Sequence, residues 1–434
     1  MSHRLQVGID FSQKRADFCL LSPDGRFIEP HKGFDNSVLG YSLAKQLLLQ
    51  ALDQHHFDGL DVSGEATGYY WLPFFLQLAA DPDLEPYDLK LFPLNPRWVH
   101  WFKKCFARDD KTDQKDSYYI AERTRTRPPD VPWSADPNHL ALRSYTRFRF
   151  HLVHNLAREK CYFSAFLFLK ASAYRRLQPF SDLFGVTSRL ILSQQPSLDQ
   201  LAALPVENVA AQLHELSGHH LPNPHSNAQK LRQVARESFV LPPTLALPMQ
   251  RILDLTLEHI RFLEGQIRQV EAWIASDVVA HPAITKLTTI PGVGPVFSAG
   301  IGAEVGDTHR FLQGVKWDNK RKRQRPRNLR DAEDAVAKIA GLWWPRSSSG
   351  DFEAEDRRMA KTGNRYLRYY FIQAANRMRQ SIPEYAAFYA RKYQEATKHR
   401  HKRALVLTAR KGVGLVIGLL HRNESYRPGG TPTS

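Results

Sequence analysis

Short apolar strands and helices alternate through residues 4–94, and this order of elements limits the folds that the chain can adopt. Three early segments read as strands separated by polar turns, at 5–9, 16–22 and 26–30. Helix and strand patterns then alternate through the segments 36–52, 60–65, 69–80 and 88–94. Three antiparallel strands followed by strand–helix units are typical of an RNase H-like α/β sheet. We therefore predict such a domain over residues 1–130.

The charge balance favours a polyanionic partner. The 434 residues include 60 Lys and Arg against 44 Asp and Glu, which gives a formal net charge of +16. Binding to phosphates would release their counterions. The apolar runs look too short to span a membrane, and the first residues lack the apolar core of a signal peptide. The three cysteines have no CxxC spacing, so we expect a cytoplasmic protein without a disulfide framework.

The rest of the chain is mainly helical in pattern. Leu253, Ile260, Ile267 and Ile274 recur every seven residues, as in a coiled coil. This repeat predicts a coiled-coil hairpin, a dimerisation helix, or a long amphipathic helix of the core. After the first domain we predict a helical middle region, a mainly helical C-terminal domain and a flexible tail, at 138–280, 281–420 and 421–434.

Four acidic residues stand where an RNase H-like sheet would bring them together. Asp10 ends the first strand, Glu65 ends a later one, and Asp113 and Asp116 share one face of a helix. Taken singly, each acid fits a surface or capping residue, and the mixed charges of 109–116 fit a solvated helix face. Four converging carboxylates would repel one another unless cations neutralised them, and their oxygens suit Mg²⁺ or Mn²⁺. Their joint placement predicts a metal site.

The segments VGIDFSQKRADFCLL, GEATGYYW, NPRWV and KTDQKDSYYIAE occur in that order. They resemble the N-terminal motifs of the DEDD insertion-sequence transposases, the one-ten family of insertion sequences. The resemblance implies a RuvC-like domain whose catalytic, metal-binding tetrad is Asp10, Glu65, Asp113 and Asp116. It also implies Mg²⁺ or Mn²⁺ as the cofactor.

The later segments IPGVGPVFSAGIGAEVGD, AGLWWPRSSSG and KTGNRYLRYYFIQAA are similar to the C-terminal transposase domain of that family. The resemblance implies a serine nucleophile that forms a phosphoserine link with DNA. Ser347, Ser348 and Ser349 are the candidates, and we assign Ser349 because it directly precedes Gly350. The family is associated with structured guide RNAs. The implied partners are therefore DNA, a guide RNA, and further copies of the chain in a homo-oligomer.

Several glycines and basic residues are predicted to contact nucleic acid. The IPGVGP segment has the form of a helix–hairpin–helix turn, whose N–H groups could approach a phosphate, although a plain tight turn also fits. The stretch 316–330 departs from the family's pattern as an insertion, and we expect a basic loop there, on nucleic acid or for solubility. Arg365 and Arg368 share one face of a helix, and Leu367 and Phe371 are available to pack inward. The two arginines could bind phosphates or simply form a solvated basic surface. The predicted contacts are Arg97, Lys111, Gly292, Gly294, Lys320, Arg321, Lys322, Arg323, Lys361, Arg365 and Arg368.

These features predict a DNA transposase or site-specific recombinase that is guided by RNA and uses both a metal site and a serine. Three alternatives remain: a metal-dependent structure-specific nuclease like the junction resolvases, a DNA invertase, and a non-catalytic nucleic-acid scaffold. The intact tetrad favours an enzyme over a scaffold. The C-terminal motifs favour a recombinase, because a hydrolytic nuclease has no need of a second catalytic domain.

Overall fold

The computed structural model describes residues 3–105, 113–129, 132–133, 136–193, 203–318, 321–345, 348–349, 352–353, 359–360 and 362–428. The chain forms two compact units. The first consists of residues 1–140 and 307–335, and the second of residues 141–306 and 336–434. The predicted domain boundaries stay a prediction.

The first unit contains a central five-stranded sheet, with strand order β3-β2-β1-β4-β5. β1 pairs antiparallel with β2 and parallel with β4, β2 pairs antiparallel with β3, and β4 pairs parallel with β5. The strands are β1 (Arg4–Phe11), β2 (Arg15–Leu21), β3 (Phe27–Asp35), β4 (Gly59–Glu65) and β5 (Lys90–Leu94). The structure thus confirms the predicted antiparallel strands at the start. β1 is the central strand, and β4, which ends at Glu65, lies beside it.

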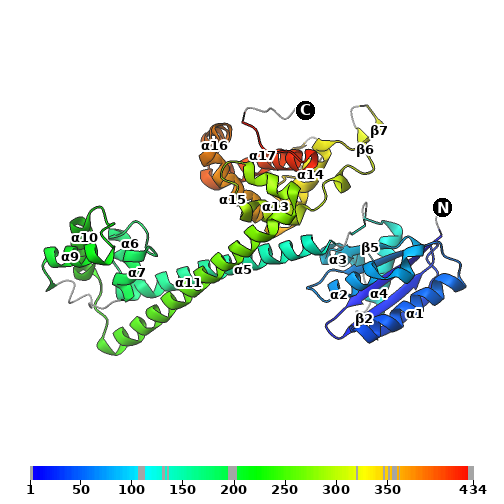
Figure 1. The fold of residues 1–434 in the computed structure, drawn as a ribbon, viewed down its shortest axis with the longest axis horizontal. Helices are drawn as coiled ribbons and strands as arrows, with labels where there is room; N and C mark the ends of the chain where they lie inside the picture. The colour runs from blue at the N-terminus through cyan, green and yellow to red at the C-terminus, as the bar shows by residue number, and fades with distance from the viewer. Residues whose placement is uncertain are drawn as a thin grey trace. The chain divides into compact units, whose positions relative to one another are not determined.

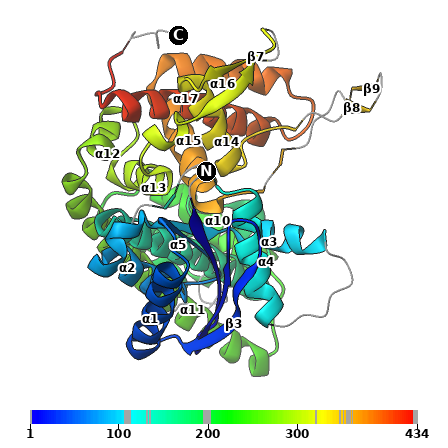
Figure 2. The ribbon, with the colours of Figure 1, turned by 90° about the vertical axis from the view of Figure 1, so that its right-hand side faces the viewer.

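Helices cover both faces of this sheet (Figure 2). On one face, Leu5, Val7 and Ile9 of β1 pack in a buried core with residues of α1 and α2. Each buried Leu or Ile side chain there contributes about 1.5–3 kcal/mol to folding. On the other face, α4 contacts β1, β2 and β4. The helices of this part are α1 (Val38–Gln54), α2 (Leu72–Ala80), η1 (Pro82–Tyr87), α3 (Pro96–Lys104) and α4 (Asp113–Thr126).

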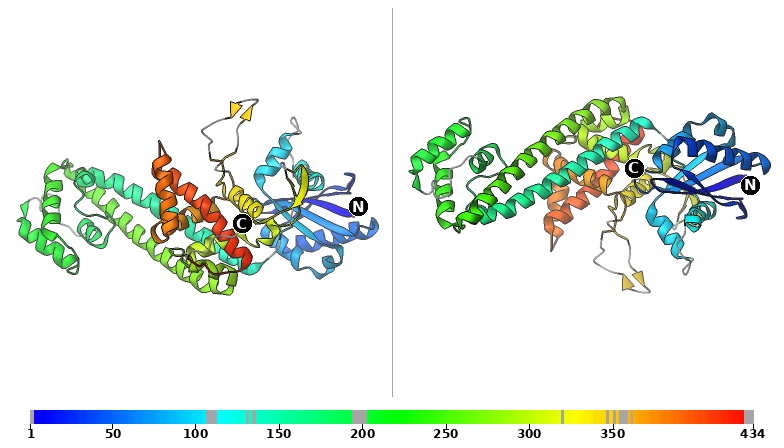
Figure 3. Two further views of the ribbon diagram at one scale, coloured as in Figure 1. Left: turned by 90° about the horizontal axis from the view of Figure 1, so that it is seen from above. Right: turned by 90° about the horizontal axis from the view of Figure 1, so that it is seen from below.

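Two long helices, α5 (Pro137–Lys170) and α11 (Pro243–Asp277), lie side by side in the second unit from Ala141 onward (Figures 1 and 3). All four residues of the seven-residue repeat in α11 are buried. They share two apolar clusters with α5, which contributes residues such as Leu152 and Phe163. The repeat therefore forms a helical hairpin within the chain, as one of the predicted alternatives has it. A role in dimerisation stays a prediction.

A small helical module connects these two helices. Its core joins Leu213, Leu231 and Val234 to Phe163 of α5 and Leu253 of α11. The module consists of α6 (Tyr174–Leu177), α7 (Val186–Ser193), α9 (Val206–Leu216) and α10 (Pro224–Glu237).

The C-terminal part of the second unit is mainly helical, as expected. α17 packs against α15 and α16, and α13 packs against α15. By length and composition α17 could cross a membrane, which the apolar runs of the sequence did not suggest. However, 56% of its most apolar window is buried inside the protein, as in a core helix. The elements are η2 (Val278–Ala280), α12 (Pro282–Lys286), η3 (Leu287–Thr289), α13 (Pro295–Val305), α15 (Arg365–Ser381), α16 (Pro383–Glu395) and α17 (Arg400–Arg422).

The basic stretch 316–330 is not the loop that its composition predicts. It forms an antiparallel hairpin of β6 (Val315–Asp318) and β7 (Arg323–Pro326), followed by α14 (Leu329–Ala340). A short 3₁₀ helix, η4 (His309–Phe311), precedes the hairpin. Repulsion between the many positive charges would oppose pairing of the two strands. The carboxylate of Asp331 reduces this repulsion, because it forms ion pairs with Lys316 and Arg325.

Candidate functional site

Asp10, the residue before the last of β1, and Glu65, the last residue of β4, stand at the same end of two adjacent parallel strands. Ile9 pairs with Gly64, so Asp10 and Glu65 are the next residues on β1 and β4. Side chains alternate between the faces of a sheet. Because Ile9 and Val62 face the core beneath α1 and α2, the two acids belong to the opposite face. That face is covered by α4.

Gly8 allows α4 to lie directly against β1. A Cβ atom at Gly8 would stand only 2.2 Å from the carbonyl oxygen of Ser117 in α4. The hydroxyl of Ser63 in β4 links the same strand and helix, because it donates to the carbonyls of Val7 in β1 at 2.9 Å and Ile120 in α4 at 3.3 Å. The close approach of the helix to the strand therefore depends on the missing side chain.

The direction of α4 brings its first turns toward the acidic end of β1. Ser117 lies against Gly8, whereas Arg125, two turns later, donates to the Pro23 carbonyl in the β2–β3 turn at 3.1 Å. That turn follows Leu21, which pairs with Gln6 near the start of β1. α4 consequently runs antiparallel to β1. Its N-terminal end, which carries two of the predicted acids, lies on the side of the strand where Asp10 stands.

Replacing Gly8 with alanine is expected to destabilise the first unit by about 1–3 kcal/mol, because the methyl group would overpack a contact between two backbones. Urea unfolding of the full chain measures this cost. Gly294→Ala is the matched control, since nothing lies within 4 Å of the position that its Cβ would take. Equal stability of both variants would contradict the close packing of α4 on β1.

Basic side chains already neutralise part of the acidic face. Asp116 is buried, and its carboxylate lies 2.8 Å from the ammonium group of Lys103 in α3. Asp17 of β2 stands opposite Asp10 in the antiparallel register and is also buried. Sequence reasoning missed this fifth acid. The signal that could have found it is an acid between Ala16 and Phe18 in an apolar strand.

Two partners hold the carboxylate of Asp17. Arg15 and the imidazole Nε2 of His31 each lie 3.1 Å from its Oδ1 atom. Glu65, in turn, accepts a hydrogen bond of 2.8 Å from the hydroxyl of Thr67. Like charges opposite each other destabilise a sheet. The basic partners of Asp17 reduce the repulsion between its carboxylate and that of Asp10.

The chemistry of this face suits a divalent metal ion. Asp10 and Glu65 present oxygen donors at the same level of the sheet, and the Lys103 ammonium group stands where a cation would neutralise Asp116. Among the described side chains, which exclude that of Asp113, no three His, Cys, Asp or Glu are grouped closely enough to hold a metal. Asp113 begins α4, so its backbone lies at the same end of the helix as Asp116.

The predicted nucleophile lies in the second unit, on a two-stranded element. β8 (Ser348–Ser349) pairs antiparallel with β9 (Phe352–Glu353), and Ser349 is directly opposite Phe352. Four predicted site residues lie outside the described residues, namely Lys111, Lys320, Ser347 and Lys361.

A buried ion pair fixes the start of α15. The guanidinium of Arg147 binds Glu304 through two hydrogen bonds, of 2.7 and 2.9 Å. The side-chain amide of Asn364 donates to the same carboxylate at 2.6 Å, while its oxygen accepts from the N–H groups of Tyr366 and Leu367. Asn364 thereby caps the helix and ties it to α13. Neither Glu304 nor Asn364 was identified from the sequence.

Gly363, just before this cap, needs to be glycine. Its φ is +118°, and a Cβ there would lie 2.3 Å from the Ile339 carbonyl oxygen. That oxygen accepts a 2.7 Å hydrogen bond from the N–H of Asn364. The TGN part of the motif is thus explained by local structure.

The two predicted arginines of α15 have partners within the second unit. Leu367 and Phe371 are buried, as predicted. The guanidinium of Arg365 lies over the rings of Tyr366 and Phe150, at 5.0 and 5.7 Å from their centroids. Arg368 is half-buried and donates to the Ala340 carbonyl at 3.5 Å. Phosphate contacts by both arginines stay a prediction.

The two glycines of the GVG turn differ in their surroundings. Gly292 has φ +82°, and its Cβ would lie 2.9 Å from the Cβ of Arg377 in α15, so its small size serves packing within the protein. Gly294 precedes α13 and has open space around it. The turn does join two helical segments, as predicted. In the first unit, Arg97 is exposed in the first turn of α3, 5.5 Å from the ring centroid of Trp101.

Asp331 organises the basic hairpin. Its carboxylate binds Lys316 at 2.6 Å and Arg325 at 2.5 Å, and it accepts a 3.0 Å hydrogen bond from the N–H of Asn328. The Asn328 side chain accepts from the N–H of Asp331 in return, as in a capping box. The Arg325 guanidinium, helped by Lys316, holds the pKa of Asp331 well below its usual range.

Asp331→Asn is expected to lower the stability of the first unit by about 2 kcal/mol at neutral pH, through lost charged hydrogen bonds. Because the pKa is depressed in the folded protein, this contribution is present above the unfolded pKa of about 4 and is lost as the pH falls below it. Thermal unfolding at several pH values should show the two proteins converging in acid. Asp35→Asn, at an exposed position of β3, is the control that should match the wild type throughout.

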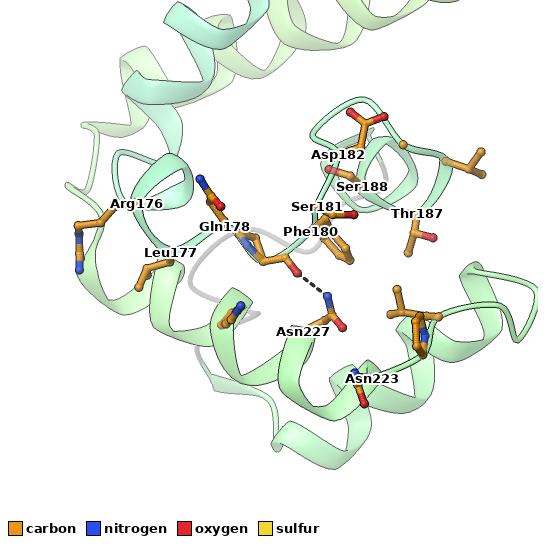
Figure 4. Close-up of a pocket in the computed structure, with 16 residues that line it drawn as sticks. Arg176, Leu177, Gln178, Phe180, Ser181, Asp182, Thr187, Ser188, Asn223 and Asn227 are labelled. Atoms are coloured by element: carbon orange, nitrogen blue, oxygen red, sulfur yellow. Dashed lines mark hydrogen bonds between the residues drawn. The ribbon is translucent and has the colours of Figure 1, made fainter. Parts of the chain in front are cut away.

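One cavity of about 540 Å³ lies in the small helical module of the second unit (Figure 4). Its lining is mostly polar and includes Arg176, Asn223 and Lys230. Asn227 crosses it and donates a hydrogen bond to the Pro179 carbonyl. None of the site residues predicted from the sequence lines this cavity.

Comparison with known proteins gives two family matches and one relative. A family model described as "Transposase" matches residues 7–169, and one described as "Transposase IS116/IS110/IS902 family" matches residues 325–390. Together they cover more than half of the 434 residues. A Pseudomonas aeruginosa protein named "Probable family 20 transposase" is 25% identical over 189 residues, which are 43% of this chain. The chain spans only 50% of that relative's length.

Proposed function

Because the chain belongs to the IS110 family of transposases, we propose that it cleaves and rejoins the DNA strands of an insertion sequence under the guidance of an RNA. The observation that carries the catalytic part is the in-register placement of Asp10 and Glu65 beneath α4. The strand order β3-β2-β1-β4-β5, with two antiparallel pairings followed by two parallel ones, supports an RNase H-like, RuvC-like fold.

Asp10, Glu65, Asp113 and Asp116 hold Mg²⁺ or Mn²⁺ in this proposal. Such ions supply electrostatic stabilisation to the attacking and leaving oxygens of a phosphate. The Lys103 ammonium group balances the charge of Asp116, and a divalent ion held by the tetrad would add to that balance. Asp17, whose carboxylate contacts Arg15 and His31, is not among the proposed ligands.

Ser349 is the nucleophile of the proposed reaction. Its hydroxyl oxygen loses its proton and forms a bond to the phosphorus of a DNA phosphodiester, and the bond from phosphorus to a sugar oxygen breaks. The sugar oxygen leaves with the bonding electron pair and takes up a proton to become a hydroxyl group. One phosphodiester thus replaces another, so that the later rejoining step needs no added energy source. The Asn364 cap and its buried Glu304 partner hold the start of α15 in place. From α15, Arg365 and Arg368 bind DNA phosphates.

A plasmid recombination assay with the full chain, its element and the flanking non-coding DNA tests this function. Joined products are expected with Mg²⁺ or Mn²⁺, loss of products with EDTA, and recovery when either ion is restored. Cleavage that releases free ends without any joined product would instead identify a hydrolytic nuclease. Activity that persists in EDTA would remove the metal site from the proposal.

A discrete RNA is expected to co-purify with the protein from cells that carry the whole element. The net charge of +16 makes phosphate contacts the main source of affinity. The RNA should therefore dissociate steeply as salt is raised, and sequencing it at moderate salt identifies its origin. If no discrete RNA is recovered, the guide RNA is excluded while the catalytic proposal still stands.

A further inference from the structure

The β6–β7 hairpin has two chemically different faces. Its register pairs Lys316 with Arg325 and Trp317 with Gln324. Because side chains alternate along each strand, one face carries Lys316, Asp318, Arg323 and Arg325. The other face carries Val315, Trp317, Gln324 and Pro326.

The charged face anchors the hairpin within the protein. Lys316 and Arg325 both bind the buried Asp331 of α14, so the two strands are fixed to a helix. Both cationic side chains are therefore already paired with a carboxylate within the protein. They cannot account for an affinity toward nucleic acid, but they make the hairpin a rigid support for the opposite face.

The opposite face leaves a large aromatic ring uncovered. Trp317 and Val315 are each 55% exposed. Within the described residues, the Trp317 indole takes part in no ring contact or hydrogen bond. An indole that is exposed on a hairpin held in place by two ion pairs is available for contact with another molecule.

Free positive charge lies at the tip of the same hairpin. Arg321, Lys322 and Arg323 are exposed and form no ion pair with any residue that the structure describes. Arg323 is opposite Asp318 and so lies on the charged face, whereas Arg321 and Lys322 stand in the turn that follows the strand of Trp317. A flat ring beside several cations complements a polyanion that also offers a flat apolar group.

We propose that the β6–β7 hairpin binds an unpaired segment of nucleic acid, with Trp317 stacked on a base and the tip cations on the flanking phosphates. Aromatic side chains beside a basic surface are the usual way to bind single strands, whereas the bases of an intact duplex are already stacked inside it. This inference rests on the proposed function, since strand exchange and guide RNAs both present unpaired bases. It adds the type of segment and the residues that bind it.

Binding of fluorescent oligonucleotides to the full chain tests the inference. The probes are a DNA strand of about 12 nucleotides, within the range of one single-strand binding module, the same sequence as RNA, and the DNA duplex. Trp317→Ala should weaken single-strand binding roughly tenfold or more and leave duplex binding unchanged, whereas Trp317→Phe should retain most of the affinity. Trp273→Ala removes another exposed tryptophan, on α11, and should have no effect.

The two single-stranded arms show whether DNA or RNA is the preferred source of the unpaired base. Cross-linking of an iodouracil probe should map to Trp317. Unchanged single-strand affinity of Trp317→Ala would overturn the inference, as would an equal loss on the duplex or tighter binding of a polyglutamate peptide. After any of these results, the proposed function would still stand if the wild-type protein recombines DNA in the plasmid assay. Failure of the wild type to bind any of the three nucleic acids would count against both.

Discussion

Asp10→Asn is expected to abolish DNA strand cleavage while the protein stays folded and bound to nucleic acid. The substitution keeps the size of the side chain but removes one charge from a metal site. A metal site supplies several kcal/mol to phosphoryl transfer, so we expect the cleavage rate to fall on the order of a thousandfold or more. Asp113→Asn should behave in the same way. The measurement is strand cleavage in the plasmid assay, with electrophoretic binding assays of the same preparations.

A stability measurement separates this result from simple misfolding. Asp10 stands opposite Asp17, and like charges in that position destabilise a sheet. The melting temperature of Asp10→Asn should therefore equal or exceed that of the wild type. Asp35→Asn makes the same chemical change at an exposed position of β3 and should cleave normally. Full activity of both Asp10→Asn and Asp113→Asn would refute the assignment of the tetrad.

Ser349→Ala is expected to eliminate both recombination and a covalent protein–DNA adduct. Removing the hydroxyl takes away the atom that would form the bond to phosphorus, so the loss should be complete within detection. Trapping the reaction on nicked or gapped DNA should yield the adduct with the wild type. After nuclease digestion, peptide mass spectrometry should find the residual phosphate in the RSSSGDF peptide. Asp10→Asn should lose the adduct as well, because an unactivated serine is a poor nucleophile.

The neighbouring serines are the matched controls for this experiment. Ser347→Ala and Ser348→Ala make the same change one or two residues away and should retain the adduct. An adduct that maps to one of them would preserve the chemistry and correct only the residue. Cleavage by Ser349→Ala that releases free ends at the wild-type rate would show that water is the nucleophile, and would favour the nuclease.

The order of neighbouring residues in the sequence determined many of the individual strands and helices. The alternation of Leu5, Val7 and Ile9 with polar or small residues predicts a strand that is buried on one face. These three residues are buried as predicted, but Gln6 and Gly8 are buried as well, because α4 covers the other face. The seven-residue repeat in α11 predicts a helix with one apolar seam, and that seam is buried. The positions of Asp10 and Glu65 at strand ends also followed from local pattern. Such features depend on neighbours within a few residues, which the sequence lists directly.

Contacts between distant residues were decided by the tertiary structure. The register between β1 and β4 decides that Glu65 lies beside Asp10. The pairing of β1 with β2 decides that Asp17 lies opposite Asp10. The direction and closeness of α4 depend on the absence of a side chain at Gly8, which no local pattern reveals. The segment that we predicted to be a loop is a hairpin, in which Asp331 neutralises Arg325 and Lys316, the latter fifteen residues earlier in the chain. These outcomes follow from packing and charge between residues far apart in sequence, and the free energy of such contacts exists only once the chain has folded.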